Sequence, residues 1–219
     1  HSYFYTSLVE RIMIPGSATP LLLAQSGDDG YKIDRSLRFN SADSAYLNRT
    51  PSSAGNRKTW TWSGWLKRYS TGIRQIFFSC WTGSTRLNFG YLEDDRFEMG
   101  TQFAYILKSN ALFRDPAAWQ HWVVSVDTTL SSNRCKVYLN GSEITSWNTN
   151  SFDSTFAQNA DTDINQAAVH YIGQLGTGTS YLNAGLADVH FIDGVSGLTA
   201  SDFGKPDDNN VWQPKKYSG

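Results

Sequence analysis

Long apolar runs and a strong excess of charge of either sign are both missing from this 219-residue chain. The run nearest to a bilayer-spanning length, residues 12–27, is interrupted by Pro15 and Pro20. It also follows Glu10 and Arg11, which makes it a poor secretory signal. The formal net charge is −1 and the basic residues are scattered, so we expect neither nucleic acid nor a membrane as a partner.

Cysteine is nearly absent, since the chain has only Cys80 and Cys135. The two residues fall in different predicted strands and lack the Cys-x-x-Cys spacing of metal and redox sites. A pair of this kind specifies no disulfide framework. We interpret both residues as buried thiols, with one disulfide as the alternative.

Long amphipathic helical patterns are also missing, whereas aromatic residues make up 14% of the chain and charged residues only 18%. Gly, Ser, Thr and Asn are frequent, which is typical of short strands joined by tight turns. Strands of this kind pack as two antiparallel sheets, so the sequence predicts an all-β sandwich. The predicted strands are 36–39, 44–49, 60–68, 74–81, 85–92, 96–103, 119–127, 134–141, 168–175 and 185–193.

The two ends of the chain differ from this strand-rich region. Residues 1–33 are apolar without clear periodicity, which favours an arm that lies on another protein, with a plain N-terminal strand as the alternative. We therefore predict an arm at 1–33, a single domain at 34–205 and a C-terminal tail at 206–219.

Four segments, in order, resemble a known family. WQHWVVSVDTTLSSNRCKVYLNGSEI (Trp119–Ile144) resembles the signature hairpin of laminin-G-like, concanavalin A-like jelly rolls. SLRFNSADSAYL is similar to the family's first hairpin, WTWSGWLKR to its next core strand, and residues 171–203 to its closing strands. The resemblance implies a two-sheet antiparallel jelly-roll sandwich. It leaves function open, because this scaffold hosts lectins, enzymes, receptors and adhesins.

A narrower likeness concerns phage proteins. SLRFNSADSAYLNRTP…NRKTWTWSGWLKR, followed by DVHFIDG…LTASDFG, is similar to laminin-G-like domains in tail-fibre and other virion proteins of aquatic bacteriophages. This resemblance implies a non-enzymatic adhesin on the virion surface that forms a homo-oligomer, docks through its arm on other virion proteins and binds a host surface glycan or a protein. The alternatives are a capsid-decorating protein without receptor binding, and a glycan-binding module or glycosidase of the laminarinase-type jelly rolls.

The sharpest enzymatic candidate is LEDDRFE, where Glu93, Asp95 and Glu98 match the E-x-D-x-x-E spacing of retaining glucanases built on this jelly roll. In those enzymes the carboxylates line one face of a strand in the cleft. Here the intervening residues are not apolar, and the Asp94-Asp95 pair is typical of a hairpin turn. We therefore predict a turn that directs these carboxylates into water with ordinary pKa values, and no catalytic residue.

Nucleophilic and metal-dependent catalysis also lack a motif. No serine lies in a G-x-S-x-G elbow, and no histidine has metal-ligand spacing to another His or Cys. His121 matches the family's strand histidine and is interpreted as a sheet residue.

Calcium is the ion that the resemblance implies, and three polar clusters could supply oxygen ligands. The first, with Asp161, Asp163 and Asn165, imitates the start of an EF-hand loop. It then fails, because Gln166 and Ile172 occupy the positions of the required Gly and bidentate Glu. Solvated loops are therefore the favoured interpretation of this cluster and of residues 27–30 and 206–210.

Carbohydrate binding would rest on aromatic and amide side chains, which stack on a pyranose ring and fix its hydroxyl groups. Packing against another domain or subunit is the alternative for each ring. The predicted carbohydrate-binding residues are Trp81, Tyr105, Trp147, Asn148, Tyr181 and Asn183.

Three tryptophans lie close together in TWTWSGWLKR (59–68). At the two-residue period of a strand, Trp60 and Trp62 face one way and Trp65 the other. We predict that Trp60 and Trp62 form the core between the sheets. For Trp65 we favour packing beneath a covering loop over a ligand contact.

Overall fold

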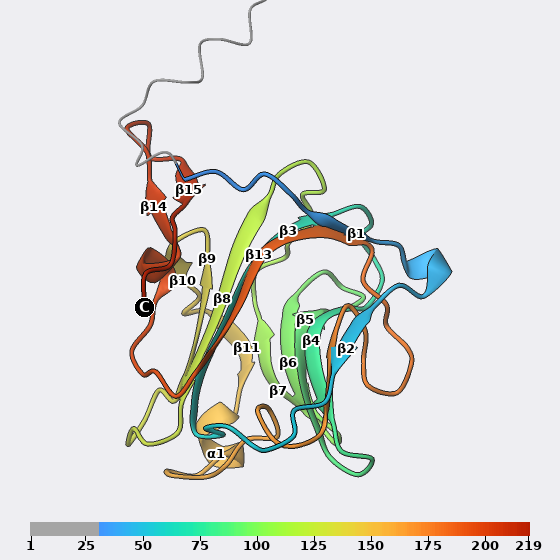
Figure 1. Ribbon diagram of the computed structural model, residues 1–219, viewed down its shortest axis with the longest axis vertical. Coiled ribbons are helices and arrows are strands. Elements are labelled where there is room, and N and C mark those ends of the chain that lie inside the picture. The colour runs from blue at the N-terminus through green and yellow to red at the C-terminus, as the bar shows by residue number, and fades with distance from the viewer. Residues whose placement is uncertain (1–30) are drawn as a thin grey trace, which may run out of the picture.

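The computed structural model describes residues 31–219 and is a sandwich of two antiparallel sheets packed face to face (Figure 1). The six-stranded sheet has the order β1-β13-β3-β8-β9-β10, formed by Leu37–Phe39, Ala184–Asp193, Thr59–Arg68, Gln120–Asp127, Cys135–Leu139 and Ser142–Glu143. The seven-stranded sheet has the order β11-β7-β6-β5-β4-β12-β2, formed by Trp147–Asn150, Tyr105–Ser109, Phe97–Thr101, Arg86–Tyr91, Gln75–Trp81, Val169–Ile172 and Leu47–Arg49. The remaining elements are the hairpin β14-β15 (Gly204–Pro206, Trp212–Pro214) and the helical turns η2 (Ser41–Asp43), α1 (Phe152–Thr155) and η3 (Ala200–Asp202).

The predicted all-β sandwich is confirmed. All ten predicted strands are present, with ends that differ by at most three residues, and β7, β10, β11, β14 and β15 were not predicted. The predicted arm lies outside the described residues up to position 30. Within residues 31–219, no helix is long and apolar enough to cross a membrane.

The core between the sheets contains Trp60 and Trp62 as predicted, and neither side chain has any exposed surface. The Trp60 Nε1–H donates to Thr162 Oγ1 over 2.9 Å, so this buried indole is satisfied. Trp62 stacks on Phe77 and meets Phe89 edge-on. The tryptophans of this strand are therefore structural and not a sugar-binding platform.

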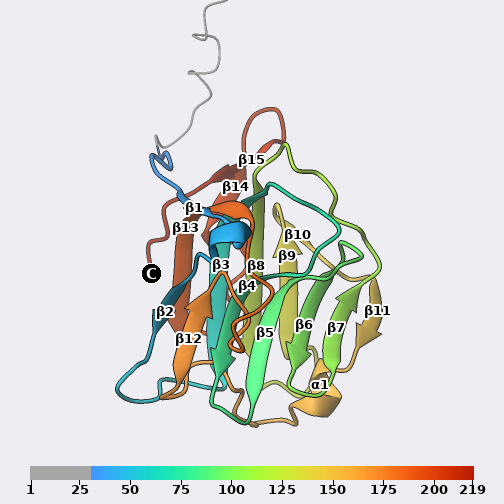
Figure 2. The ribbon, with the colours of Figure 1, turned by 90° about the vertical axis from the view of Figure 1, so that its right-hand side faces the viewer.

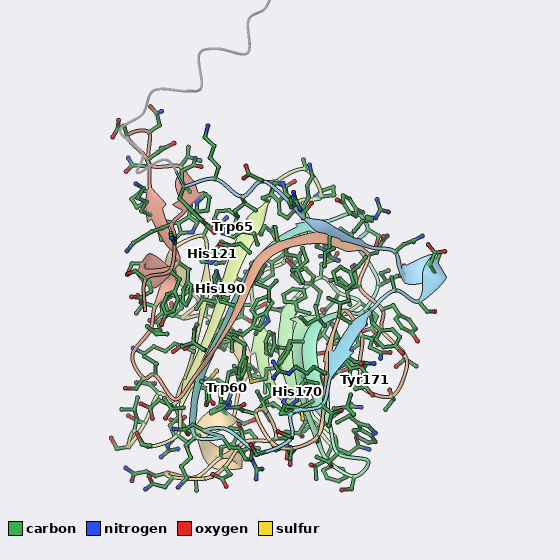
Figure 3. The ribbon with its side chains drawn as sticks, viewed as in Figure 1. Trp60, Trp65, His121, His170, Tyr171 and His190 are labelled. Carbon is green, nitrogen blue, oxygen red and sulfur yellow. The ribbon has the colours of Figure 1, made fainter. Side chains whose placement is uncertain are left out.

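The C-terminal segment covers the outer face of the six-stranded sheet (Figure 1). Residues 206–219, predicted as a tail, contribute Trp212 and Tyr217 to this cover. Trp65 lies on the same face, where it is 6% exposed and stacks on His121 with ring centroids 4.9 Å apart (Figure 3). The prediction that Trp65 packs is confirmed.

The loop of residues 173–183 crosses part of the outer face of the seven-stranded sheet (Figure 2). The Ser79 hydroxyl donates to Gln174 O over 2.9 Å, and the Ile76 N–H donates to Ser180 O over 3.1 Å. A Cβ on Gly176 would lie 2.3 Å from the Cβ of Trp81, so only glycine permits this close approach. The loop therefore covers β4 and leaves the outer face of β5, β6 and β7 to other side chains.

Both thiols are free. Cys80 is buried, and burial raises the pKa of its thiol to about 12. Cys135 packs against the core from β9, and burial also raises its pKa. The interpretation as buried thiols is confirmed for Cys80 and holds in part for Cys135, which is partly exposed.

Candidate functional site

The predicted turn between β5 and β6 is confirmed. The Leu92 N–H donates to Arg96 O over 2.9 Å, and the Asp95 N–H donates to Leu92 O over 3.0 Å. Glu93 is exposed at this turn, as expected. The three carboxylates therefore do not line one strand.

The expectation that all three carboxylates reach water with ordinary pKa values is wrong for Asp95 and Glu98, which are both buried. Burial alone would raise the pKa of Asp95, but hydrogen bonds from the Gly72 N–H, Arg114 and Arg68 outweigh it and the pKa is lowered. For Glu98, burial dominates over the opposing effect of Arg74 and raises the pKa to about 7. Asp95 is buried because it pairs with the buried Arg68. Glu98 is buried because it lies in strand β6 and pairs with Arg74.

Glu98 lies on the outer face of β6, since its neighbours Phe97 and Met99 point into the core. Asn88 lies on the outer face of the adjacent strand β5. The register pairs Gly90 with Glu98 and Asn88 with Gly100, so each polar side chain has a glycine opposite it. The two buried polar side chains of Asn88 and Glu98 thus have no side chain directly across from them in the pairing of β5 with β6.

The hydrogen bonds of this pair are incomplete. Glu98 Oε1 accepts from Arg74 Nε over 2.8 Å, from Arg74 Nη2, and from Asn88 Nδ2 over 3.2 Å. Glu98 Oε2 and Asn88 Oδ1 are buried and have no hydrogen-bond partner among residues 31–219. An unmet buried acceptor costs about 1–3 kcal/mol, so these oxygens lower stability unless something else binds them.

An aromatic ring and a second guanidinium border the same place. A Cβ on Gly100 would stand 3.0 Å from Glu98 Oε2, 3.4 Å from Ala104 O and 3.5 Å from Tyr105 Cδ1. Tyr105 is 45% exposed, and the Arg74 guanidinium lies 5.6 Å from its ring centroid. Arg86 donates from Nε to Thr101 O over 3.3 Å, and its pKa is lowered by burial and then by Arg74.

We name this site the Glu98 patch and define it as a floor of four residues with three more at its rim. The floor is Asn88, Gly90, Glu98 and Gly100, and the rim is Arg74, Arg86 and Tyr105. In β5 and β6 the outward positions alternate between polar residues and glycine, as the sequence shows. The pattern was not recognised because Glu98 was predicted to lie in a turn.

The predicted carbohydrate-binding residues fall into two groups. Trp81, Tyr105 and Tyr181 lie on the outer side of the seven-stranded sheet, at β4, at β7 and in the covering loop. The other three do not join them. Trp147 packs edge-on against core residue Phe97, Asn148 is exposed at an irregularity of β11, and Asn183 donates to Ser70 Oγ over 3.0 Å.

A groove lies on the opposite side of the molecule. It is an open groove of about 970 Å³ bordered by Trp65, Trp119 and Trp212 together with residues 31–36 and 207–214. Trp119 is 37% exposed there. This tryptophan groove is the structural competitor of the Glu98 patch for any ligand that stacks on aromatic rings.

Retaining glycoside hydrolysis requires two carboxyl groups about 5–5.5 Å apart on either side of the scissile bond. The three E-x-D-x-x-E carboxylates lie in different surroundings, and Glu93 is exposed at the turn. Asp95 binds Arg68 over 2.9 Å and Arg114 over 3.0 Å, whereas Glu98 binds Arg74. The spacing in the sequence is therefore not assembled into the glucanase arrangement.

Ser63 and His121 form a buried pair with a Ser Oγ to His Nε2 distance of 2.8 Å. The Trp212 Nε1–H donates to His121 Nδ1 over 3.0 Å, so Nδ1 is an acceptor and the ring proton sits on Nε2. Burial lowers the pKa of His121 to about 4, which keeps the ring neutral. A serine hydrolase needs the opposite tautomer, with Nε2 free to accept the serine proton. The pair therefore does not activate Ser63.

The calcium candidates do not converge. Asp161 is 3.6 Å from Arg57, Asp163 accepts from Thr85, and Asn165 donates to Asp193 over 2.7 Å. Residues 27–30 lie outside the described residues. Across residues 31–219, no group of three or more His, Cys, Asp or Glu side chains could hold a metal ion.

Residues 39–201 match the family described as the "Concanavalin A-like lectin/glucanases superfamily". The chain belongs to this superfamily. The superfamily includes lectins without enzymatic activity as well as glycosidases, so membership alone does not choose between them. No curated protein matches the chain.

Three solved structures with a similar fold share little sequence with this chain. A heptameric SAP-like pentraxin from Limulus polyphemus is 17% identical with a TM-score of 0.45, over 67% of this chain and 68% of that one. Domain 4 of an extracellular arabinanase from Geobacillus stearothermophilus, solved with arabinotriose, is 18% identical with a TM-score of 0.46, over 68% and 66%. A galectin from Caenorhabditis elegans is 9% identical with a TM-score of 0.42, over 74% and 99%.

Proposed function

We propose that this domain is a non-enzymatic carbohydrate-binding module and that the Glu98 patch is its binding site. One observation carries the proposal. Two buried acceptor oxygens, Glu98 Oε2 and Asn88 Oδ1, lack partners next to a half-exposed tyrosine ring. Sugars offer the matching chemistry, because a pyranose has an apolar face for the ring and hydroxyl groups that donate to carboxylate and amide oxygens.

In the proposed complex a pyranose stacks on Tyr105 and its hydroxyl groups donate to Glu98 Oε2 and Asn88 Oδ1. The two oxygens are covered in the ligand-free protein, so the partly exposed Arg86 side chain turns aside as the sugar enters. Its guanidinium then donates to sugar oxygens at the rim. The gain comes from satisfying two acceptors that already lack partners in the free protein.

The absence of hydrolysis in this proposal rests on the missing carboxylate pair. Glu98 has a pKa of about 7 and could act as an acid on that ground alone. Of the other two motif carboxylates, Asp95 is held by two arginines, and Glu93 is exposed at the turn, where its charge helps to raise the pKa of Glu98. A binding function needs only the Glu98 carboxylate.

The wider role follows from the resemblance to phage virion domains. We infer that the module is displayed on a virion surface as a tail-fibre or appendage adhesin, with residues 1–33 docking it on other virion proteins in a homo-oligomer. Mass spectrometry of purified particles, with antibody labelling in electron microscopy, tests this placement. Labelled particles without glycan binding would leave capsid decoration as the function.

A glycan array probed with the 1–219 chain tests the binding function. We expect hits for the unmodified chain, and a Tyr105→Ala variant that binds the same glycans about tenfold or more weakly, because the stacking ring is lost. Trp119→Ala is the matched control, since it removes a ring of similar exposure from the tryptophan groove. An array without hits overturns the function. Loss of binding in Trp119→Ala but not in Tyr105→Ala overturns the site.

A further inference from the structure

One lateral side of the sandwich is open. β1 pairs with β13 only from Ala184 to Leu186, so the rest of β13 is the edge of the six-stranded sheet. β2 is the edge of the seven-stranded sheet. Between these two edges lies a pocket of about 740 Å³, a size typical of small-molecule sites.

The interior of this edge pocket is apolar. It is lined by inner-face residues of both sheets: Leu47, Trp62, Phe78, Ile172, Val189 and Phe191. Ile172, Val189 and Phe191 pack against the core but remain partly exposed, and Leu47 is 46% exposed. Core side chains are therefore in contact with solvent along this side, and a bound apolar group would remove them from water.

The other end of the pocket is polar. Arg49 is opposite His170 in the β2–β12 register, and both line the pocket. His170 is neutral, because its Nε2 accepts from the Asn165 N–H over 2.9 Å and burial lowers its pKa. The Asp193 carboxylate accepts from the Asn56 N–H and from Asn165 Nδ2, each over 2.7 Å. The Arg49 guanidinium makes no hydrogen bond or ion pair within residues 31–219.

Trp62 borders the edge pocket from the core side. Its Nε1–H is fully buried and has no acceptor among the described residues, although the neighbouring Trp60 indole has one. Trp62 lines the pocket, so a bound molecule lies against its ring. Buried indole N–H groups usually have a partner.

We propose that the edge pocket binds a small amphipathic carboxylate of the fatty-acid class. The apolar chain occupies the space between Leu47, Phe78 and Val189, and the carboxylate pairs with the unpaired Arg49. The choice of an anion rests on charge complementarity, since Arg49 has no ion pair within residues 31–219, whereas Asp193 already accepts hydrogen bonds from Asn56 and Asn165. This site is separate from the Glu98 patch, so glycan-binding results do not decide it.

Contact quenching of tryptophan fluorescence tests the proposal. Titration of the 1–219 chain with ω-bromododecanoate is expected to give saturable quenching, and Trp62→Phe is expected to reduce its amplitude. Val189→Phe fills the pocket and should abolish the quenching, whereas Val195→Phe makes the same change in an exposed loop outside the pocket and should leave it intact. Arg49→Gln should weaken dodecanoate binding about 10- to 100-fold and dodecanol binding little.

The proposal is overturned by a lack of saturable quenching, by equal effects of Val189→Phe and Val195→Phe, or by acid binding that does not respond to Arg49→Gln. Melting temperatures confirm that each variant is folded. Should Val189→Phe fail to fold, Arg49→Gln still decides the question, because Arg49 is an exposed residue whose side chain makes no hydrogen bond or ion pair within residues 31–219.

Discussion

Glu98 predicts an unusual pH dependence of stability. Burial raises its pKa from the ordinary 4.5 to about 7 in the folded protein. Between these values the folded state binds more protons than the unfolded state, so the free energy of unfolding falls as the pH rises. This is the reverse of the effect of Asp95, whose lowered pKa adds stability above its unfolded pKa that is lost as pH falls.

The magnitude follows from the pKa difference. One pKa unit corresponds to about 1.4 kcal/mol, so the full effect is about 3 kcal/mol, of which about 2.5 kcal/mol falls between pH 5 and pH 8. Glu98→Gln removes the titration. The variant should therefore gain about 2.5 kcal/mol relative to the unmodified protein when the pH is raised from 5 to 8, whatever its absolute stability.

Urea unfolding followed by tryptophan fluorescence at pH 5, 6, 7 and 8 measures this difference. Histidine titration is common to both proteins and cancels in the comparison. Glu93→Gln, in the exposed turn of the same hairpin, should keep most of the pH dependence, because the Glu93 charge contributes least to the shift of the Glu98 pKa and burial contributes most. The reasoning is refuted if the difference in the free energy of unfolding between Glu98→Gln and the unmodified protein stays constant with pH or changes in the opposite direction. Either result would show that the ion pair with Arg74 outweighs burial in setting the pKa of Glu98.

Two further predictions concern buried groups. Asp95→Asn should destabilise the protein by about 3–5 kcal/mol in urea, because Arg68 has no exposed side-chain surface and would lose its counter-charge. Asp94→Asn, whose partners Arg96 and Lys108 are partly exposed, should cost less than about 1 kcal/mol, and equal costs would contradict the contrast. Cys80 and Cys135 should react with iodoacetamide at pH 8 only after denaturation, as measured by mass spectrometry, because both thiol pKa values are raised. Rapid labelling of the native protein would be the contrary result.

Most of the longer predicted strands, such as β4, β5 and β8, are rich in buried aromatic and aliphatic residues, which is a signal that the sequence carries. β7 was missed because a register irregularity places Ile106 and Leu107 both in the core, which removes the two-residue period. β11 was missed for a related reason, since its sequence WNTN is polar and its pairing with β7 shifts after Trp147. These two strands form because β7 pairs with β6 and β11 pairs with β7. Their own sequence patterns do not predict them.

The candidate site was less accessible to sequence reasoning than the fold. Of the predicted carbohydrate-binding residues, Tyr105 is the one that borders the Glu98 patch. Arg74 and Glu98 are 24 residues apart in the sequence and come together only in the folded sheet. No local sequence pattern predicts such a pair. The edge pocket depends on β1 being only three residues long, a length that pattern recognition does not fix to within one residue.

The contrast between Asp95 and Glu98 is one of complete and incomplete hydrogen bonding. Both are buried and lie three residues apart, yet Asp95 has donors on both oxygens, Gly72 and Arg68 on Oδ1 and Arg114 on Oδ2. Glu98 leaves one oxygen without a donor and carries a raised pKa. The ion pair with Arg74 uses only Oε1, so it does not account for the unmet Oε2. Local features that reduce stability without a compensating contact are expected at functional sites, and this is why the Glu98 patch, and not the better satisfied Asp95 cluster, is the place to look for a ligand.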